Sequence, residues 1–333
     1  MKKKLLLLLT ILLLLTGCKN TKYKGTVNVL NWTSYIPDSV IRGFEKEYNI
    51  KVNYGTYSSN EELLAKITSS KKGTYDLIFP SDYMVELMIK RNIIEKIDKE
   101  KLSNIKNINE SFLKQPFDKN NDYSLPFLLA TTTLVVNKDN IKEDITSYKQ
   151  LLNPKYKNNI VLLEDQRIVI GAALQALGYS INDTDSNHLE EAYNFLIDLK
   201  KNVKAFDSDS PKTFLITKEV DLGLVWNAEA ILAKSENKNI EIVYPKDGYA
   251  LSMDNYTIVK GSKNKENAYL LIDYLLRDEN CIKIISEYPY ISTNKNVGNY
   301  STEELERIIK NGSYIENVGD KIKEIDKLWA RIK

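Results

Sequence analysis

The stretch Leu30-Asn31-Trp32-Thr33-Ser34-Tyr35-Ile36-Pro37 joins a predicted strand to a predicted helix. Before it, Thr26-Val27-Asn28-Val29-Leu30 alternates as a strand does. After it, residues 37–44 begin with a proline, which is favoured in the first turn of a helix. A Trp and a Tyr therefore stand at the C-terminal end of a strand, where open α/β sheets bind ligands. The turn predicts either a ligand contact or two aromatic side chains that cover a helix entrance.

The same arrangement recurs along the chain. The apolar strand Asp76–Phe79 is followed by Pro80-Ser81-Asp82-Tyr83 and an amphipathic helix, so the first part alternates strands and helices. A second α/β unit begins near Ser147, and its strands 160–163 and 221–226 again end in polar or aromatic residues. Residues 131–137 and 256–259 are suited to run between the two units. This order predicts two α/β lobes, each with a mostly parallel sheet flanked by helices.

Aromatic rings and carboxylates gather at these strand ends. A carboxylate gives an ammonium charge-assisted hydrogen bonds, and aromatic faces attract its charge and cover its methylenes. The set therefore suits an alkylammonium ligand. The candidate ligand-binding residues are Trp32, Thr33, Tyr35, Ser81, Tyr83, Asp165, Trp226, Asp254 and Tyr290.

Several functional classes are excluded by composition. The chain of 333 residues has one histidine, His188, and two cysteines, Cys18 and Cys281. Multi-histidine metal sites and a disulfide within the part after Cys18 are therefore ruled out, and no nucleophile–base pair stands out. We expect no enzymatic activity, no cofactor and no metal. No basic cluster after Lys19 would bind phosphates, so we expect no nucleic-acid partner.

The N-terminus has the pattern of an export signal. Lys2-Lys3-Lys4 precedes an apolar run, Leu5–Leu15, that is too short to span a bilayer comfortably. Leu15-Thr16-Gly17-Cys18 resembles the lipobox of bacterial lipoproteins. That resemblance implies a signal peptide over residues 1–17, lipidation of Cys18 and a tether over 18–25. Without its three N-terminal lysines the chain has 44 basic and 45 acidic residues, so its formal charge is close to zero.

Several separated motifs, in order, resemble the polyamine-binding proteins of bacterial ABC importers, the spermidine/putrescine-binding group. They are Asn31–Pro37, Tyr75–Tyr83, Pro116-Phe117-Asp118, Asn121–Pro126, Leu222–Asn227 and Met253-Asp254.

The resemblance implies a type II periplasmic-binding-protein clamshell that captures spermidine or putrescine between its lobes. Importer permeases would be its partners, and the lipid its only attachment to the membrane on the extracytoplasmic side. We expect a monomer. The expected lobes are 26–130 with 254–300, and 131–253 with 301–333.

The chain departs from this family at three pocket positions. Ile168 and Ser252 stand where the family usually has a glutamate and a tryptophan, and Ile315 falls where a pocket glutamine is expected. These departures leave open which polyamine binds. The ligand could also be another small amine or solute, and the protein could act as a ligand sensor for a membrane receptor. Asp82 and Glu229 are alternatives for the missing carboxylate, and Tyr288 competes with Tyr290 for the pocket.

Overall fold

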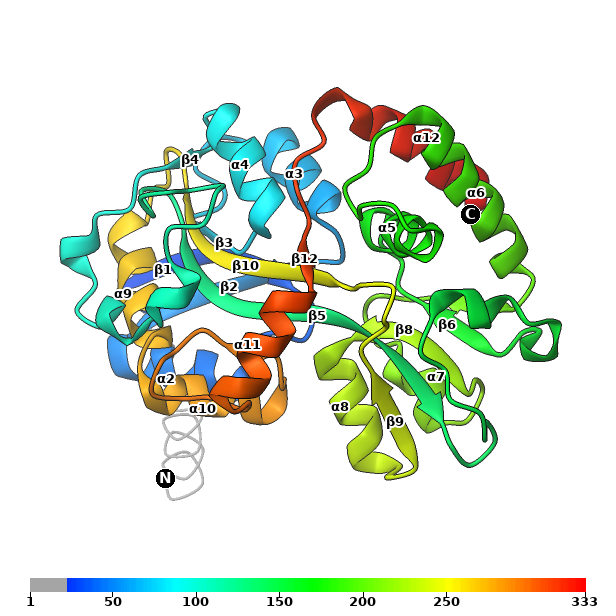
Figure 1. The fold of residues 1–333 in the computed structure, drawn as a ribbon. Helices are drawn as coiled ribbons and strands as arrows, with labels where there is room; N and C mark the ends of the chain where they lie inside the picture. Colours follow the sequence, from blue (N-terminus) through cyan, green and yellow to red (C-terminus); the bar gives the residue numbers. More distant parts are fainter. Residues whose placement is uncertain (1–22) are drawn as a thin grey trace, which may run out of the picture.

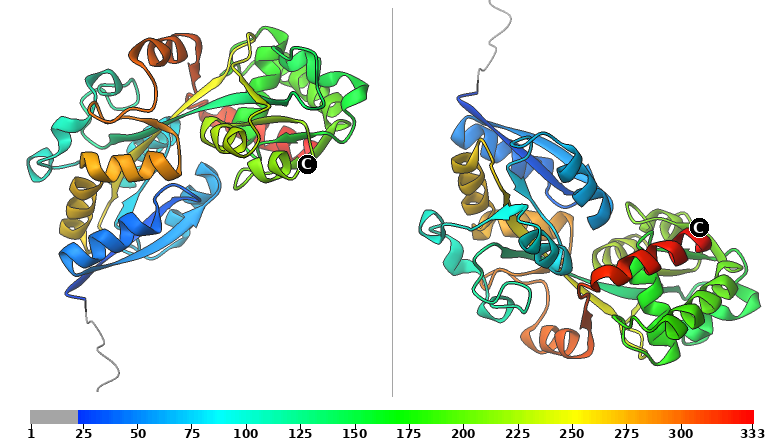
Figure 2. Two further views of the ribbon diagram at one scale, coloured as in Figure 1. Left: turned by 90° about the horizontal axis from the view of Figure 1, so that it is seen from below. Right: turned by 90° about the horizontal axis from the view of Figure 1, so that it is seen from above.

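The computed structural model describes residues 23–333, and these form two α/β lobes (Figure 1). The lobes are distinct in both views of Figure 2. The two-lobed α/β architecture predicted from the sequence is therefore confirmed. The predicted signal peptide and the lipidation site Cys18 lie outside the described residues.

The sheet of the first lobe is built around β1 (Gly25–Trp32). Val29 of this strand aligns in parallel with Tyr54 on one side and with Leu77 on the other. Its inward residues Val27 and Val29 are completely buried, as the alternating pattern predicts. The other strands of this sheet are β2 (Ile50–Tyr57), β3 (Leu77–Ile78), β4 (Ile94–Glu95) and the antiparallel β10 (Ala250–Val259).

Helices cover both faces of this sheet (Figure 1). Val40 and Phe44, four residues apart in one helix, are fully buried against the sheet because they lie on the same helical face. That helix ends at Asn49, whose φ of 54° is a left-handed cap. The helices of the lobe are α2 (Asp38–Tyr48), α3 (Asn60–Ser69), α4 (Asp82–Lys90), α9 (Lys265–Leu275) and α10 (Asp278–Glu287).

The second lobe has a smaller mixed sheet. Its strands β6 (Ile160–Leu162), β7 (Val203–Phe206) and β8 (Leu222–Trp226) are parallel, and β9 (Ile240–Val243) pairs with β5 (Leu125–Asn137). Figure 1 shows α7 and α8 on one side of this sheet, with α5, α6 and α12 on the other. These helices are α5 (Gln166–Leu177), α6 (Ser186–Lys200), α7 (Lys212–Ile216), α8 (Asn227–Glu236) and α12 (Ile322–Ile332).

Two long strands join the lobes. The first half of β5 pairs antiparallel with β10, and its second half, from Thr132, pairs antiparallel with β8. All thirteen residues of β5 and all ten of β10 are buried, in keeping with strands that are covered on both faces. The predicted crossover strands 131–137 and 256–259 are thus the ends of longer strands.

The C-terminal part contacts both lobes. Ile308 of α11 (Thr302–Asn311) packs in a cluster with Phe112 and Met253, and β12 (Ser313–Tyr314) pairs with β10. Helix α12 packs instead against α5 and α6. The proposed lobe boundaries are best drawn with residues 301–311 beside the first lobe and α12 in the second. None of the helices within residues 23–333 is long and apolar enough to cross a membrane.

Candidate functional site

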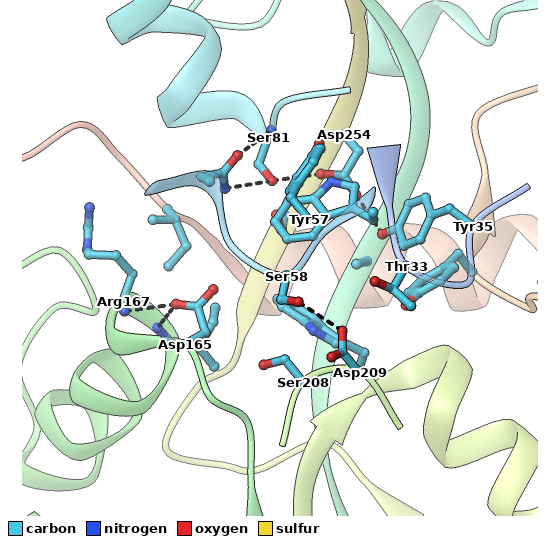
Figure 3. A pocket seen from close by; sticks show the side chains of 18 of the residues that line it. Thr33, Tyr35, Tyr57, Ser58, Ser81, Asp165, Arg167, Ser208, Asp209 and Asp254 are labelled. Carbon is cyan, nitrogen blue, oxygen red and sulfur yellow. Dashed lines mark hydrogen bonds between the residues drawn. The ribbon is translucent and has the colours of Figure 1, made fainter. Parts of the chain in front are cut away.

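A pocket lies between the lobes where the parallel strands end (Figure 3). Its walls enclose about 610 Å³ of space between atoms, part of it open to solvent. The structure brings all nine sequence-predicted residues to this pocket. They are Trp32, Thr33, Tyr35, Ser81, Tyr83, Asp165, Trp226, Asp254 and Tyr290.

Asp254 is the most deeply buried charged group of the pocket, with 2% of its surface exposed. Its Oδ2 accepts a hydrogen bond of 2.6 Å from the Tyr35 hydroxyl, and its Oδ1 accepts one of 2.6 Å from Ser81 Oγ. Burial raises the pKa of Asp254 to about 7, although both hydroxyls lower it. No lysine or arginine within the described chain forms a salt bridge with this carboxylate, so a ligand cation would be its first charge partner.

The local backbone explains where Asp254 lies. The β5–β10 ladder shifts register between Asp254 and Asn255, opposite Pro126, which has no N–H to donate. Ser81 precedes the first turn of α4, but its hydroxyl does not cap that helix; it bonds to Asp254 instead. The sequence predicts a connecting loop over Tyr249–Met253, directly before Asp254 and the crossover strand. That prediction is wrong, because β10 begins at Ala250 and carries Asp254 in its middle.

Aromatic side chains form the wall around Asp254. The ring of Tyr35 lies 4.6 Å from that of Tyr290, and Trp32 lies 4.6 Å from Tyr57. Trp32 Nε1 and the Tyr57 hydroxyl both donate to the carbonyl of Phe79, at 3.0 and 2.6 Å, so these two rings are held in place. Such faces can cover methylenes and attract a cation.

Asp165 occupies the other side of the pocket, at the N-terminus of α5 (Figure 3). Its Oδ1 accepts hydrogen bonds from the backbone N–H of Arg167 and Ile168, at 2.9 and 3.1 Å. The residue is half-buried, and burial raises the pKa of its carboxyl. Asp165 and Asp254 thus present two carboxylates from different lobes to one pocket.

The pocket also has a cationic lining residue, Arg167. Its guanidinium donates to the carbonyl of Glu316 at 2.9 Å and to Asn182 Oδ1 at 3.1 Å, and it lies 5.4 Å from the ring of Tyr83. These contacts hold it away from hydrogen-bonding distance of Asp165 and Asp254.

The three departures from the family pattern all lie on the pocket wall. Ile168, Ser252 and Ile315 line it, with 3%, 8% and 3% of their surface exposed. At these positions the wall therefore offers two aliphatic groups and one hydroxyl, and no carboxylate, indole or amide.

Neither candidate for the missing carboxylate lines the pocket. Glu229 is paired with Lys212, whose Nζ is 2.9 Å from both of its oxygens. Asp82 accepts the backbone N–H of Tyr83 at 2.8 Å and that of Met253 at 3.3 Å. Of the two competing tyrosines, Tyr290 lines the pocket and Tyr288 does not.

Sequence reasoning missed several lining residues. Tyr57 is the last residue of β2, Ser58 and Asn60 come just after it, and Ser208 and Asp209 follow β7. The signal for them is the same as for Trp32 and Ser81, namely a polar or aromatic residue just beyond a parallel strand. Ser58 Oγ donates to Asp209 Oδ1 at 3.0 Å, and this bond crosses from one lobe to the other.

Comparison with known proteins places this chain in a family. The profile of the bacterial extracellular solute-binding proteins matches residues 39–309, well over half of the chain. The chain belongs to this family.

Among its relatives, the spermidine/putrescine-binding periplasmic protein of Escherichia coli is 38% identical over 319 residues, with 93% of this chain and 92% of the relative covered. A solved structure from Listeria monocytogenes has a TM-score of 0.87 at 32% identity and covers 92% of this chain and 98% of its own. The spermidine/putrescine ABC transporter substrate-binding protein of Streptococcus pneumoniae has a TM-score of 0.75 at 30% identity, with 93% and 98% covered. The predicted clamshell fold is thus confirmed.

The buried carboxyls of this solute-binding protein predict how its stability depends on pH. Burial raises the pKa of Asp254 to about 7 and that of Asp82 to about 8, whereas both would ionise near pH 4 in the unfolded chain. Between these values the folded form binds more protons, so its free energy of unfolding falls as pH rises. We expect the ligand-free protein to melt several degrees lower at pH 8 than at pH 5.5.

Thermal denaturation at both values, without ligand, measures this difference. Asp254→Asn should flatten the dependence, because the variant lacks one of the buried carboxyls that titrate in this range. A melting temperature that rises from pH 5.5 to pH 8 would contradict the prediction.

Proposed function

We propose that this protein is an extracytoplasmic substrate-binding protein that captures a polyamine, spermidine or putrescine, and delivers it to the permease of an ABC importer. The observation that carries the proposal is the pair Asp165 and Asp254, which form no salt bridge with a basic side chain within residues 23–333 and flank an aromatic pocket. Ligand ammonium groups would neutralise them, and the rings would cover the methylenes. The names of the relatives support the same ligand class and partner. The protein acts by binding and performs no chemistry.

Calorimetric titration of the purified protein tests this proposal. The panel is putrescine, cadaverine, spermidine and spermine, with 1,4-butanediol as an uncharged match for putrescine. We expect saturable one-to-one binding of at least one polyamine and none of the diol. A protein that binds no polyamine, or that binds the diol equally well, would refute the proposal.

The replacements at Ile168 and Ser252 favour a second candidate, in which the preferred ligand is another small amine. A wall that has lost a carboxylate and an indole holds fewer charges and covers less ligand. Strongest binding of cadaverine in the same panel would support this candidate over spermidine or putrescine.

We also propose that the protein is a monomer anchored to the membrane by lipid on Cys18. The lipobox-like stretch Leu15-Thr16-Gly17-Cys18 supports the anchor. Because the thiol accepts the first lipid, Cys18→Ser is expected to abolish lipid attachment and to release the protein or leave it unprocessed. Metabolic labelling with a fatty acid measures this, and equal labelling of the variant would rule the anchor out.

A further inference from the structure

A second cavity between the lobes lies beside the pocket and shares Asp165 with it. Ser58, Asp165, Ser208 and Asp209 line both spaces, so the two are adjacent. Carboxylates of both lobes line the second space, and no lysine or arginine of residues 23–333 does. A cationic ligand entering here would meet a favourable potential before it reaches Asp254.

Glu61, in the first turn of α3, is a carboxylate of the first lobe that lines the second cavity together with Asp165. The Tyr83 hydroxyl, which itself belongs to a pocket residue, donates to Glu61 Oε1 at 3.0 Å. Glu61 is half-buried in the second cavity. Burial and the facing charge of Asp165 raise the pKa of Glu61 to about 7. The empty protein thus holds two repelling carboxylates across the cleft.

Side-chain and helix N–H donors reach only one oxygen of each of these two carboxylates. Asp165 Oδ1 accepts the backbone N–H groups of Arg167 and Ile168, and Glu61 Oε1 accepts the hydrogen bond of the Tyr83 hydroxyl. Within residues 23–333, neither Asp165 Oδ2 nor Glu61 Oε2 receives a side-chain hydrogen bond or an ion pair. The other groups facing Glu61 are Tyr83, already bonded to it, and Arg167, whose guanidinium is held by Glu316 and Asn182.

We propose that Glu61 and Asp165 bind one ammonium group of the ligand together, one carboxylate from each lobe. This inference rests on the proposed function and names the residue that supplies the carboxylate absent at Ile168. An ammonium has three N–H donors, so it can bond to both free oxygens at once. It also cancels the repulsion between them, and for that reason its binding draws the lobes together. Asp254 then receives the ammonium at the other end of the ligand.

Glu61→Gln tests this assignment, with Glu164→Gln as the matched control. Glu164 is the neighbour of Asp165 and lines the same cavity, but its carboxylate is paired with Lys333 at 2.8 Å. Both changes remove one negative charge from the cleft, so they share any long-range effect. We expect Glu61→Gln to weaken binding of the best polyamine about tenfold or more, and Glu164→Gln about twofold or less.

Proton release provides a readout that a purely structural role would not change. An ammonium beside Glu61 forces that carboxyl to ionise, so binding near pH 6.5 should release protons. Calorimetry in two buffers with different ionisation enthalpies counts them. Glu61→Gln should release fewer protons than wild type, while Glu164→Gln should match it.

The outcomes separate the two proposals. Wild type that binds polyamines, with Glu61→Gln equal to it in affinity and proton release, overturns the carboxylate pair alone. Wild type that binds no polyamine overturns both. Misfolding is checked by thermal denaturation at pH 8, where Glu61→Gln should be at least as stable as wild type, and Asp165→Asn provides a second variant with the same expected loss of affinity.

Discussion

Asp254→Asn is expected to weaken polyamine binding by about two orders of magnitude or more. An ammonium buried without its carboxylate is an uncompensated charge, which costs on the order of 3–5 kcal/mol. Asp254 is almost fully buried and accepts the Tyr35 and Ser81 hydroxyls at 2.6 Å. The asparagine keeps the shape and one acceptor oxygen, so the loss should reflect charge. Titration calorimetry at moderate salt measures it, since screening removes the effects of exposed charges.

Asp82→Asn is the matched control for this variant. Asp82 is equally buried and lies on the neighbouring segment, but it bonds to backbone N–H groups and does not line the pocket. We expect its replacement to change the affinity about threefold or less. If Asp254→Asn binds the polyamine as tightly as wild type does, Asp254 is wrongly assigned as a ligand contact.

The part of the site that could be predicted from the sequence follows from one local rule. Trp32 and Trp226 are the last residues of their strands and Ser81 lies shortly after one, and a turn or a helix start marks the end of each strand. In a parallel sheet these ends meet at one edge, so separate segments predict one pocket. The structure places all of them there.

The missed residues show where the rule fails. The strand Val203–Phe206 has a lysine within it and only half-buried or exposed residues, so the sequence gives little strand signal and Ser208 and Asp209 went unrecognised. Strand β2 runs to Tyr57, beyond the apolar residues that define its start. Its extension depends on pairing with the whole length of β1, which is a tertiary effect.

Long-range packing also decided the role of the carboxylates. Asp82 and Glu229 lie beside pocket motifs in the sequence. In the structure, however, Asp82 accepts backbone N–H groups and Glu229 forms an ion pair with Lys212. Glu61 carries no motif and reads as an ordinary acid in the first turn of a helix. Only the fold brings it to Tyr83 and opposite Asp165.

Ile168→Glu is expected to shift the preference of the protein toward spermidine over putrescine by about tenfold or more. Ile168 lines the pocket with 3% of its surface exposed, so a carboxylate there would face the ligand. A hydrogen bond to a charged group contributes about 1.5–3 kcal/mol, which is one to two orders of magnitude in affinity. The gain in affinity should be larger for spermidine, because its third ammonium can bind the additional carboxylate. Parallel titrations with both polyamines measure the ratio of affinities.

A competing geometry makes Ile168→Gln the necessary control. Residue 168 is the third residue of α5 after the cap Asp165, and a glutamate at that position can turn back to the backbone N–H of the cap residue. Glutamine can make the same turn without the charge, so a selectivity change shared by both variants would not come from the carboxylate. If Ile168→Glu raises the melting temperature and leaves the affinity ratio unchanged, the introduced carboxylate caps the helix, and the expected gain for spermidine is contradicted.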